Sequence, residues 1–268
     1  MISGTVRDNH KLDRRLAPHR TWTVTMTTPA FAATSIPSYR LAGWAAIASG
    51  AIGLLAHGFL WAFLVSRLSG GDERTCMPLL RTHDAGVIFQ ALFLIPVVIA
   101  LGGVGGQHSR GGGRATVAMG VMAASLIVLS LLLVFVNVAT DGTFMVSQGV
   151  LGIWLIVASR LASNGLPRYL KWLGTVAGVG LVLVAAFGIG YFIFVDSRIG
   201  PVPFDYQPPK GTEMANDILH GILLIGSFMG VTTLPIWTAL VGVWLLRKRG
   251  RTEGAPWGRT LTKACSGR

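Results

Sequence analysis

The sequence predicts an all-α, polytopic membrane protein whose fold is a bundle of six transmembrane helices. Of its 268 residues, 51% are hydrophobic and only 13% are charged, whereas soluble domains carry about 25% charged residues. The charged residues cluster at the two ends and in short stretches between long apolar runs. This pattern excludes a soluble enzyme, a disordered protein and a disulfide-rich secreted module.

Six apolar runs approach or exceed the roughly 20 helical residues that cross a hydrocarbon core of ~30 Å. They are apolar almost all round, unlike a surface helix of a soluble protein, which has a polar stripe. A helix satisfies its own backbone hydrogen bonds in lipid, so each run is expected to be helical. The runs are residues 41–65, 85–104, 115–139, 144–159, 172–195 and 218–246.

The runs divide the chain into a transmembrane domain, residues 39–249, and two basic end segments. Residues 1–38 are expected to be disordered and cytoplasmic. They lack the apolar core of a signal peptide, because residues 21–28 are rich in threonine. Met26 is an alternative start to Met1. The tail, residues 250–268, is also expected to be disordered and cytoplasmic, because it has too little apolar content to pack.

Several small or helix-breaking residues lie inside the runs. Pro96 and Pro235 each remove a backbone donor and are expected to kink their helices. The pairs Gly174-x-x-x-Gly178 and Gly226-x-x-x-Gly230 allow close approach of helices. In a chain with 35 glycines such pairs also arise by chance, so we interpret them as internal packing rather than as a dimer interface.

The distribution of basic residues predicts the orientation. Residues 1–40, the second and fourth connections and residues 247–268 together hold 18 of the 23 basic residues, and the other three connections hold five. Basic residues are retained on the cytoplasmic side, so both termini are expected in the cytoplasm, in the plasma membrane. The net charge of +12 therefore reflects orientation and not nucleic-acid binding.

The two cysteines fall on opposite sides of the membrane in this topology. Cys76 lies in the first outer connection and Cys265 in the inner tail, so they cannot form a disulfide. A membrane-impermeant thiol reagent is expected to label Cys76 and to spare Cys265.

Three stretches resemble a known family. Residues 152–180 read GIWLIVASRLASNGLPRYLKWLGTVAGVG, in which a helix ends in a basic residue and the next opens with LG and small residues. The entry YRLAG at residues 39–43 and the ending at residues 235–247, with PIW and LLR, are similar. Together they resemble a bacterial family of six-helix membrane proteins classed as a domain of unknown function, the 4386 type. The resemblance implies the architecture and no mechanism.

Polar side chains gather in the outer half of the predicted bundle. His57 lies deepest, four residues beyond the centre of the first run at Gly53 and thus ~6 Å outward of the midplane. Polar groups inside membranes are costly and point to function or to contacts between helices. The candidate site residues are His57, His83, Asp84, Gln90, Asn137, Asp141, Gln148, Asp196, Asp217 and His220.

Three interpretations of this cluster remain open. The polar groups can be solvated helix ends and interhelical hydrogen bonds, a proton or ion path, or a zinc site formed by His57, His83 and His220. No H-E-x-x-H motif is present, and with His57 the only deep histidine, paired haem ligands are lacking.

The function predicted first is a non-enzymatic integral membrane protein that senses or assists other membrane components. The alternatives are a proton- or ion-coupled carrier and a metal-dependent enzyme at the outer face. No cofactor is expected. The expected partners are the lipid bilayer and other membrane proteins, and not nucleic acid.

Overall fold

A computed structural model describes residues 39–105, 110–161, 165–197 and 207–253. All of these residues belong to one compact unit. The predicted disorder of residues 1–38 and of the tail from residue 254, the alternative start at Met26, and Cys265 lie outside the described residues.

The described chain is helical throughout, apart from its turns. Six of its segments are long and apolar enough to cross a membrane, so the predicted six-helix architecture is confirmed. The helices are α1 (Tyr39–Leu68), α2 (Glu73–Gly105), α3 (Arg110–Phe135), α4 (Asp141–Leu161), α5 (Arg168–Phe194), α6 (Glu213–Gly226), the π-helical turn η1 (Ser227–Val231) and α7 (Thr233–Glu253).

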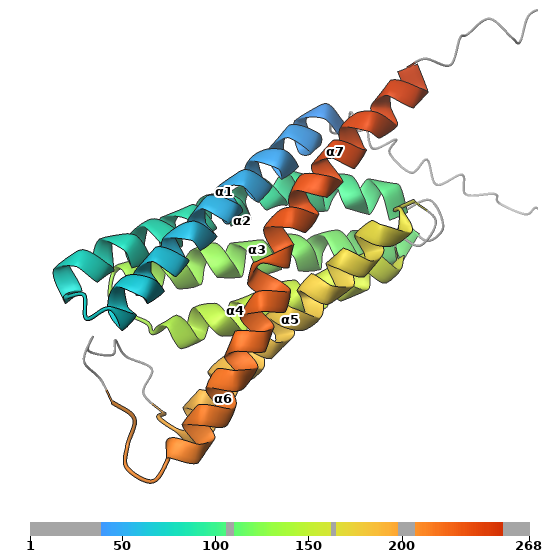
Figure 1. The fold of residues 1–268 in the computed structure, drawn as a ribbon. Coiled ribbons are helices and arrows are strands. Elements are labelled where there is room, and N and C mark those ends of the chain that lie inside the picture. Colours follow the sequence, from blue (N-terminus) through green and yellow to red (C-terminus); the bar gives the residue numbers. More distant parts are fainter. Residues whose placement is uncertain (1–38, 106–109, 162–164, 198–206, 254–268) are drawn as a thin grey trace, which may run out of the picture. The chain divides into compact units, whose positions relative to one another are not determined.

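The helices form a ring in sequence order. Each of α1 to α5 packs on the next, and α7 packs on both α5 and α1 (Figure 1). The ring closes only along part of its height. The first half of the sixth span, α6, packs on α5, and its second half, α7, crosses to α1 (Figure 1).

Glycines bring the helix backbones into contact at three crossings. A Cβ atom on Gly178 of α5 would lie 2.6 Å from the carbonyl oxygen of Gly152 in α4, and one on Gly242 of α7 would lie 2.6 Å from that of Gly43 in α1. A Cβ on Gly230 would lie 2.7 Å from the carbonyl carbon of Gly180. These distances confirm that the predicted small-residue pairs serve internal packing.

The sixth span differs from the single helix predicted at residues 218–246. It begins at Glu213, passes through η1 and ends at Glu253, four residues beyond the predicted domain end. Pro235 lies in the first turn of α7, where a missing N–H costs little. It marks the start of a new helix, whereas Pro96 lies inside the continuous α2.

The second helix begins twelve residues earlier than predicted. Asp72 caps it, because its Oδ1 accepts a hydrogen bond from the backbone N–H of Thr75 at 3.0 Å. Hydrogen bonds from the side chain and backbone of Thr75 lower the pKa of Asp72. His83 and Asp84 are therefore about three turns inside α2 and do not open it.

The early start of α2 also changes the position of Cys76. Its side chain is 0% exposed, and its Sγ donates to Ser66 Oγ at 3.5 Å. The expectation that an aqueous thiol reagent reaches Cys76 is therefore wrong, because the thiol is packed between α1 and α2.

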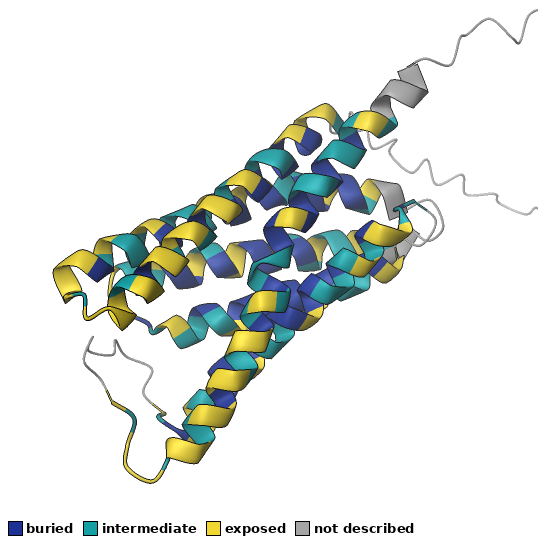
Figure 2. Ribbon diagram, in the orientation of Figure 1, coloured by how far each residue is buried: buried dark blue, intermediate teal, exposed yellow. Residues whose placement is uncertain are grey.

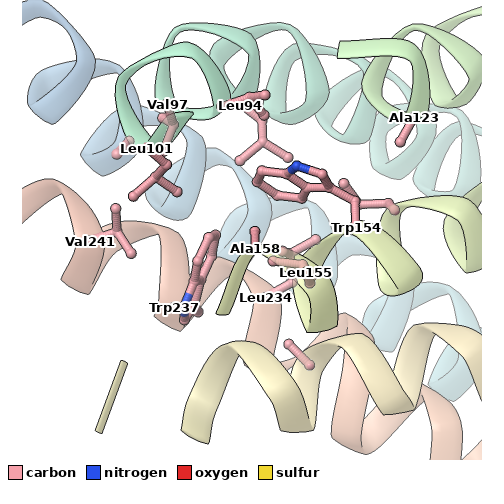
Figure 3. Close-up of a cluster of buried hydrophobic side chains, with 14 of the residues drawn as sticks. Leu94, Val97, Leu101, Ala123, Trp154, Leu155, Ala158, Leu234, Trp237 and Val241 are labelled. Carbon is pink, nitrogen blue, oxygen red and sulfur yellow. The ribbon is translucent and has the colours of Figure 1, made fainter. Parts of the chain in front are cut away.

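Two tryptophans fill the half of the bundle that carries the α2–α3 and α4–α5 connections, called here the predicted inner half. Trp154 and Trp237 meet edge to face with ring centroids 6.3 Å apart (Figure 3). Each indole N–H donates at 2.9 Å to a backbone carbonyl, of Thr116 and Leu170 respectively. Outward faces of the helices carry exposed apolar side chains such as Leu55 and Phe228, and Figure 2 shows the buried residues gathered on the inward faces.

The glycine contacts predict a packing-specific loss of stability. Gly178→Leu would force a side chain against the Gly152 carbonyl and Ile156, and overpacking costs about 1–3 kcal/mol. We expect a clear fall in the melting temperature of the purified protein. Gly58→Leu is the matched control, because nothing lies within 4 Å of a Cβ there. Equal melting temperatures for the two variants would contradict the α4–α5 contact.

Candidate functional site

A cavity of about 1150 Å³ opens at one end of the bundle. This end carries the α1–α2, α3–α4 and α5–α6 connections and is called here the predicted outer end. The cavity, called here the outer cavity, is lined by side chains from α1 to α6. Five of the ten predicted site residues line it: Asp84, Asn137, Asp141, Asp196 and His220.

Arg81 fixes one wall of the outer cavity. Its Nη1 donates to the carbonyl of Val134 at 3.3 Å and its Nη2 to Asn137 Oδ1 at 3.2 Å. The guanidinium also lies 5.0 Å from the centre of the Phe135 ring. Asn137 adopts a positive φ of 55°, which asparagine tolerates better than most residues. Arg81 thus joins α2 to the turn after α3.

Two carboxylates from different helices face the same cavity. Asp84 of α2 is only 4% exposed, whereas Asp141, the first residue of α4, is exposed. They lie close enough to interact electrostatically with each other and with Arg81. One guanidinium group therefore lies within electrostatic range of two carboxylates. These carboxylates would attract an additional cation in the cavity.

An aromatic group forms the opposite wall, on α5 and α6. The imidazole of His220 meets the rings of Phe187 and Tyr191 edge-on, with centroids 5.5 Å and 6.5 Å away. Its Nδ1 hydrogen-bonds the carbonyl of Asn216 at 2.8 Å. Aromatic faces of this kind attract cations as well as apolar groups.

Two predicted site residues lie deeper, apart from the outer cavity. Gln90 of α2 and Gln148 of α4 line a separate internal cavity of about 30 Å³, called here the central cavity. Both side chains are buried.

His57 connects α1 to the break in the sixth span. Its Nε2 accepts a hydrogen bond from Trp61 Nε1 at 3.0 Å and lies 3.1 Å from Thr232 Oγ1, directly after η1. Because Nε2 accepts, the neutral ring carries its proton on Nδ1, which has no partner. His57 thus occupies a contact between helices.

The three histidines are not brought to one point. His83 is buried where α2 crosses α1 and hydrogen-bonds the carbonyl of Ala56 through Nδ1 at 3.0 Å. His57 lies near it, within electrostatic range, but His220 is held against α5. Within the described residues, no group of three His, Cys, Asp or Glu side chains is placed to hold a metal ion.

The remaining predicted residue, Asp217, is exposed on α6 and does not line the outer cavity. Sequence reasoning missed Arg81, Tyr191 and Asn216 as cavity residues. The helix cap at Asp72 is the signal that would have extended α2 and placed Arg81 three residues before Asp84, on one helix face.

The contact of His57 predicts a difference between two substitutions. His57→Phe removes the acceptor for Trp61 and the partner of Thr232, and unpaired polar groups cost about 1–3 kcal/mol. His57→Gln keeps an acceptor oxygen, so its melting temperature should lie closer to that of the parent. His220→Phe is the control, because its ring packing on α5 survives. A loss for His57→Phe no larger than for His220→Phe would show that the contact contributes nothing.

Comparison with known proteins gives no matching family model, no matching curated protein and no matching solved structure. The functional argument therefore rests on the geometry of the outer cavity and on the sequence.

Proposed function

We propose that this chain is a non-enzymatic protein of the plasma membrane that binds an amphiphilic cation in the outer cavity and senses it. The observation that carries the proposal is the cavity itself, whose volume of about 1150 Å³ exceeds that of most small-molecule sites. It combines carboxylate, guanidinium and aromatic groups in one space, and one of the carboxylates, that of Asp84, is buried.

The lining indicates the class of ligand. Four acidic and two basic side chains line the cavity. The acidic residues are Glu73, Asp84, Asp141 and Asp196, and the basic residues are Arg67 and Arg81. Much of the remaining wall is apolar or aromatic, including Phe63, Phe187 and Phe192. A molecule with a positive group and an apolar body complements both parts.

The arrangement of the sixth span supports entry from the lipid side. Because α6 packs on α5 while α7 packs on α1, the ring of helices is less closed between α1 and α6. Phe63 of α1 and Leu223 of α6 both line the cavity. An amphiphile dissolved in the outer leaflet would reach the carboxylates by passing between these two helices.

The proposal also includes the orientation of the chain, its location in the plasma membrane and its family relationship. The ratio of 18 to five basic residues supports termini in the cytoplasm and the outer cavity on the far side of the plasma membrane. Likeness to the 4386-type family supports the same six-helix architecture and adds no activity. Lipids are the partners that the exposed apolar faces fit.

Binding of a charged dye tests the proposal. We expect rhodamine 6G, a fluorescent lipophilic cation, to bind the protein in lipid nanodiscs, and Asp141→Asn to weaken binding about tenfold by removing a cavity charge. Asp217→Asn is the matched control, since it removes an exposed carboxylate outside the cavity. Fluorescence polarisation measures both. Equal affinities for the two variants, or tighter binding of an anionic fluorescein ester, would overturn the proposal.

A second candidate function is a proton- or ion-coupled carrier. The buried Asp84 beside Asp141 favours it, as does the interrupted sixth span, because carriers use broken helices near their sites. Proteoliposomes distinguish the two functions. A carrier moves the dye across the membrane at a pH-dependent rate that Asp84→Asn abolishes, whereas a sensor binds it without net flux.

Orientation is tested with a cysteine placed on the exposed loop before α6. In a Cys76→Ser background, Lys210→Cys should react with a membrane-impermeant maleimide on intact cells, because Lys210 is exposed at the predicted outer end. Cys265 should react only after the cells are permeabilised. Labelling of Cys265 alone on intact cells would reverse the topology.

A further inference from the structure

Two amide groups in the centre of the bundle lack hydrogen-bond partners. Gln90 Nε2 and Gln148 Oε1 are fully buried and unpaired, on side chains only 7% and 8% exposed. One atom is a donor and the other an acceptor, and both side chains line the central cavity. A protein interior rarely leaves such groups unpaired unless water or another guest pairs with them.

The surroundings leave these amides no alternative partner. The rest of the central cavity is lined by apolar residues, among them Leu94, Leu151 and Leu181. The Gln90 amide lies against Gly53 of α1, where a Cβ atom would come within 2.6 Å of Nε2, so the absence of a side chain at Gly53 leaves room for the amide. The pair also lies level with Gly53, the centre of the first predicted span, where unpaired polar groups are most costly.

The break in the sixth span lies at the same cavity. Val231, the last residue of η1, lines the central cavity. Pro235 lies four residues after Val231 and has no N–H, so no α-helical hydrogen bond from Pro235 to Val231 continues the helix across the break. The break in the span and the two amides therefore occur around one small space.

We infer that the central cavity holds one or two ordered water molecules that bridge Gln90 to Gln148. A volume of about 30 Å³ accommodates water, which needs roughly 10–15 Å³ measured in this way. Water accepts a hydrogen bond from the Gln90 N–H and donates one to the Gln148 oxygen at the same time. A metal cation cannot accept from an N–H, and an anion cannot donate to a carbonyl.

The bridge joins helices that otherwise scarcely meet. The second and fourth helices lie apart in the ring and touch each other only slightly. On each of them the glutamine lies about two turns inward of an aspartate of the outer cavity, Asp84 on α2 and Asp141 on α4. The water therefore links, at the membrane centre, the two helices that carry the carboxylates. This inference does not depend on the ligand proposed for the outer cavity.

Nuclear magnetic resonance tests the inference directly on the unmodified full-length chain. The sequence has only four glutamines, so selective ¹⁵N-glutamine labelling in lipid nanodiscs gives few side-chain amide signals. Gln90→Met and Gln148→Met identify two of them by loss of a signal. We expect the Gln90 and Gln148 amides to show cross-relaxation with a bound water. Absence of that cross-relaxation in the unmodified protein would overturn the inference.

A thermal double-mutant cycle gives the second measurement. Each single Met variant leaves the other amide unpaired, whereas the double variant replaces both with apolar groups. We expect each single change to lower the melting temperature by about 3–8 °C, and the double change to lower it by less than their sum. Gln207→Met, at an exposed position, should leave it unchanged. Additive losses would contradict a water shared by the two amides. A melting temperature that rises with sodium concentration would indicate that the central cavity binds a cation in place of water.

Discussion

Close backbone contact between helices is the interaction on which this structure depends. In hydrocarbon, apolar side chains gain little by leaving lipid for a neighbouring helix, so association relies on shape and van der Waals contact. Gly152 meets Gly178, Gly43 meets Gly242, and Gly180 meets Gly230. These crossings join α4 to α5, α1 to α7, and α5 to the π-helical turn, and with them the ring of helices closes. Exposed leucines and phenylalanines on the outer faces only make the ring soluble in the bilayer.

The sixth span makes the two halves of the ring different. Its inner part, α7, reaches α1, and the space inside is filled by Trp154 and Trp237 (Figure 3). Its outer part, α6, stays on α5 and leaves the outer cavity between itself and α1. The π-helical turn, followed by Pro235, gives the change of direction, and His57 holds Thr232 at that point. One irregular turn therefore separates a packed half from a hollow half.

The polar side chains of the span region divide into three environments with different physical roles. Asp84, Asp141 and Arg81 face the outer cavity, where charge can act on a ligand. His57 and His83 make hydrogen bonds at helix crossings. Gln90 and Gln148 line the central cavity, each with an unpaired amide atom. A polar residue in a membrane segment thus has a role that depends on the environment it faces.

The sequence by itself determined the number of spans and the internal use of the glycine pairs. These follow from local composition, because the thickness of a bilayer requires long apolar helices whatever they pack against. Five of the ten predicted polar residues line the outer cavity. Only the tertiary structure decided that Cys76 is buried, that the sixth span breaks at Ser227–Val231, and that His220 stays apart from His57 and His83. The physical reason is that these outcomes depend on which helix faces meet, and the apolar runs are too uniform around their circumference to record that choice.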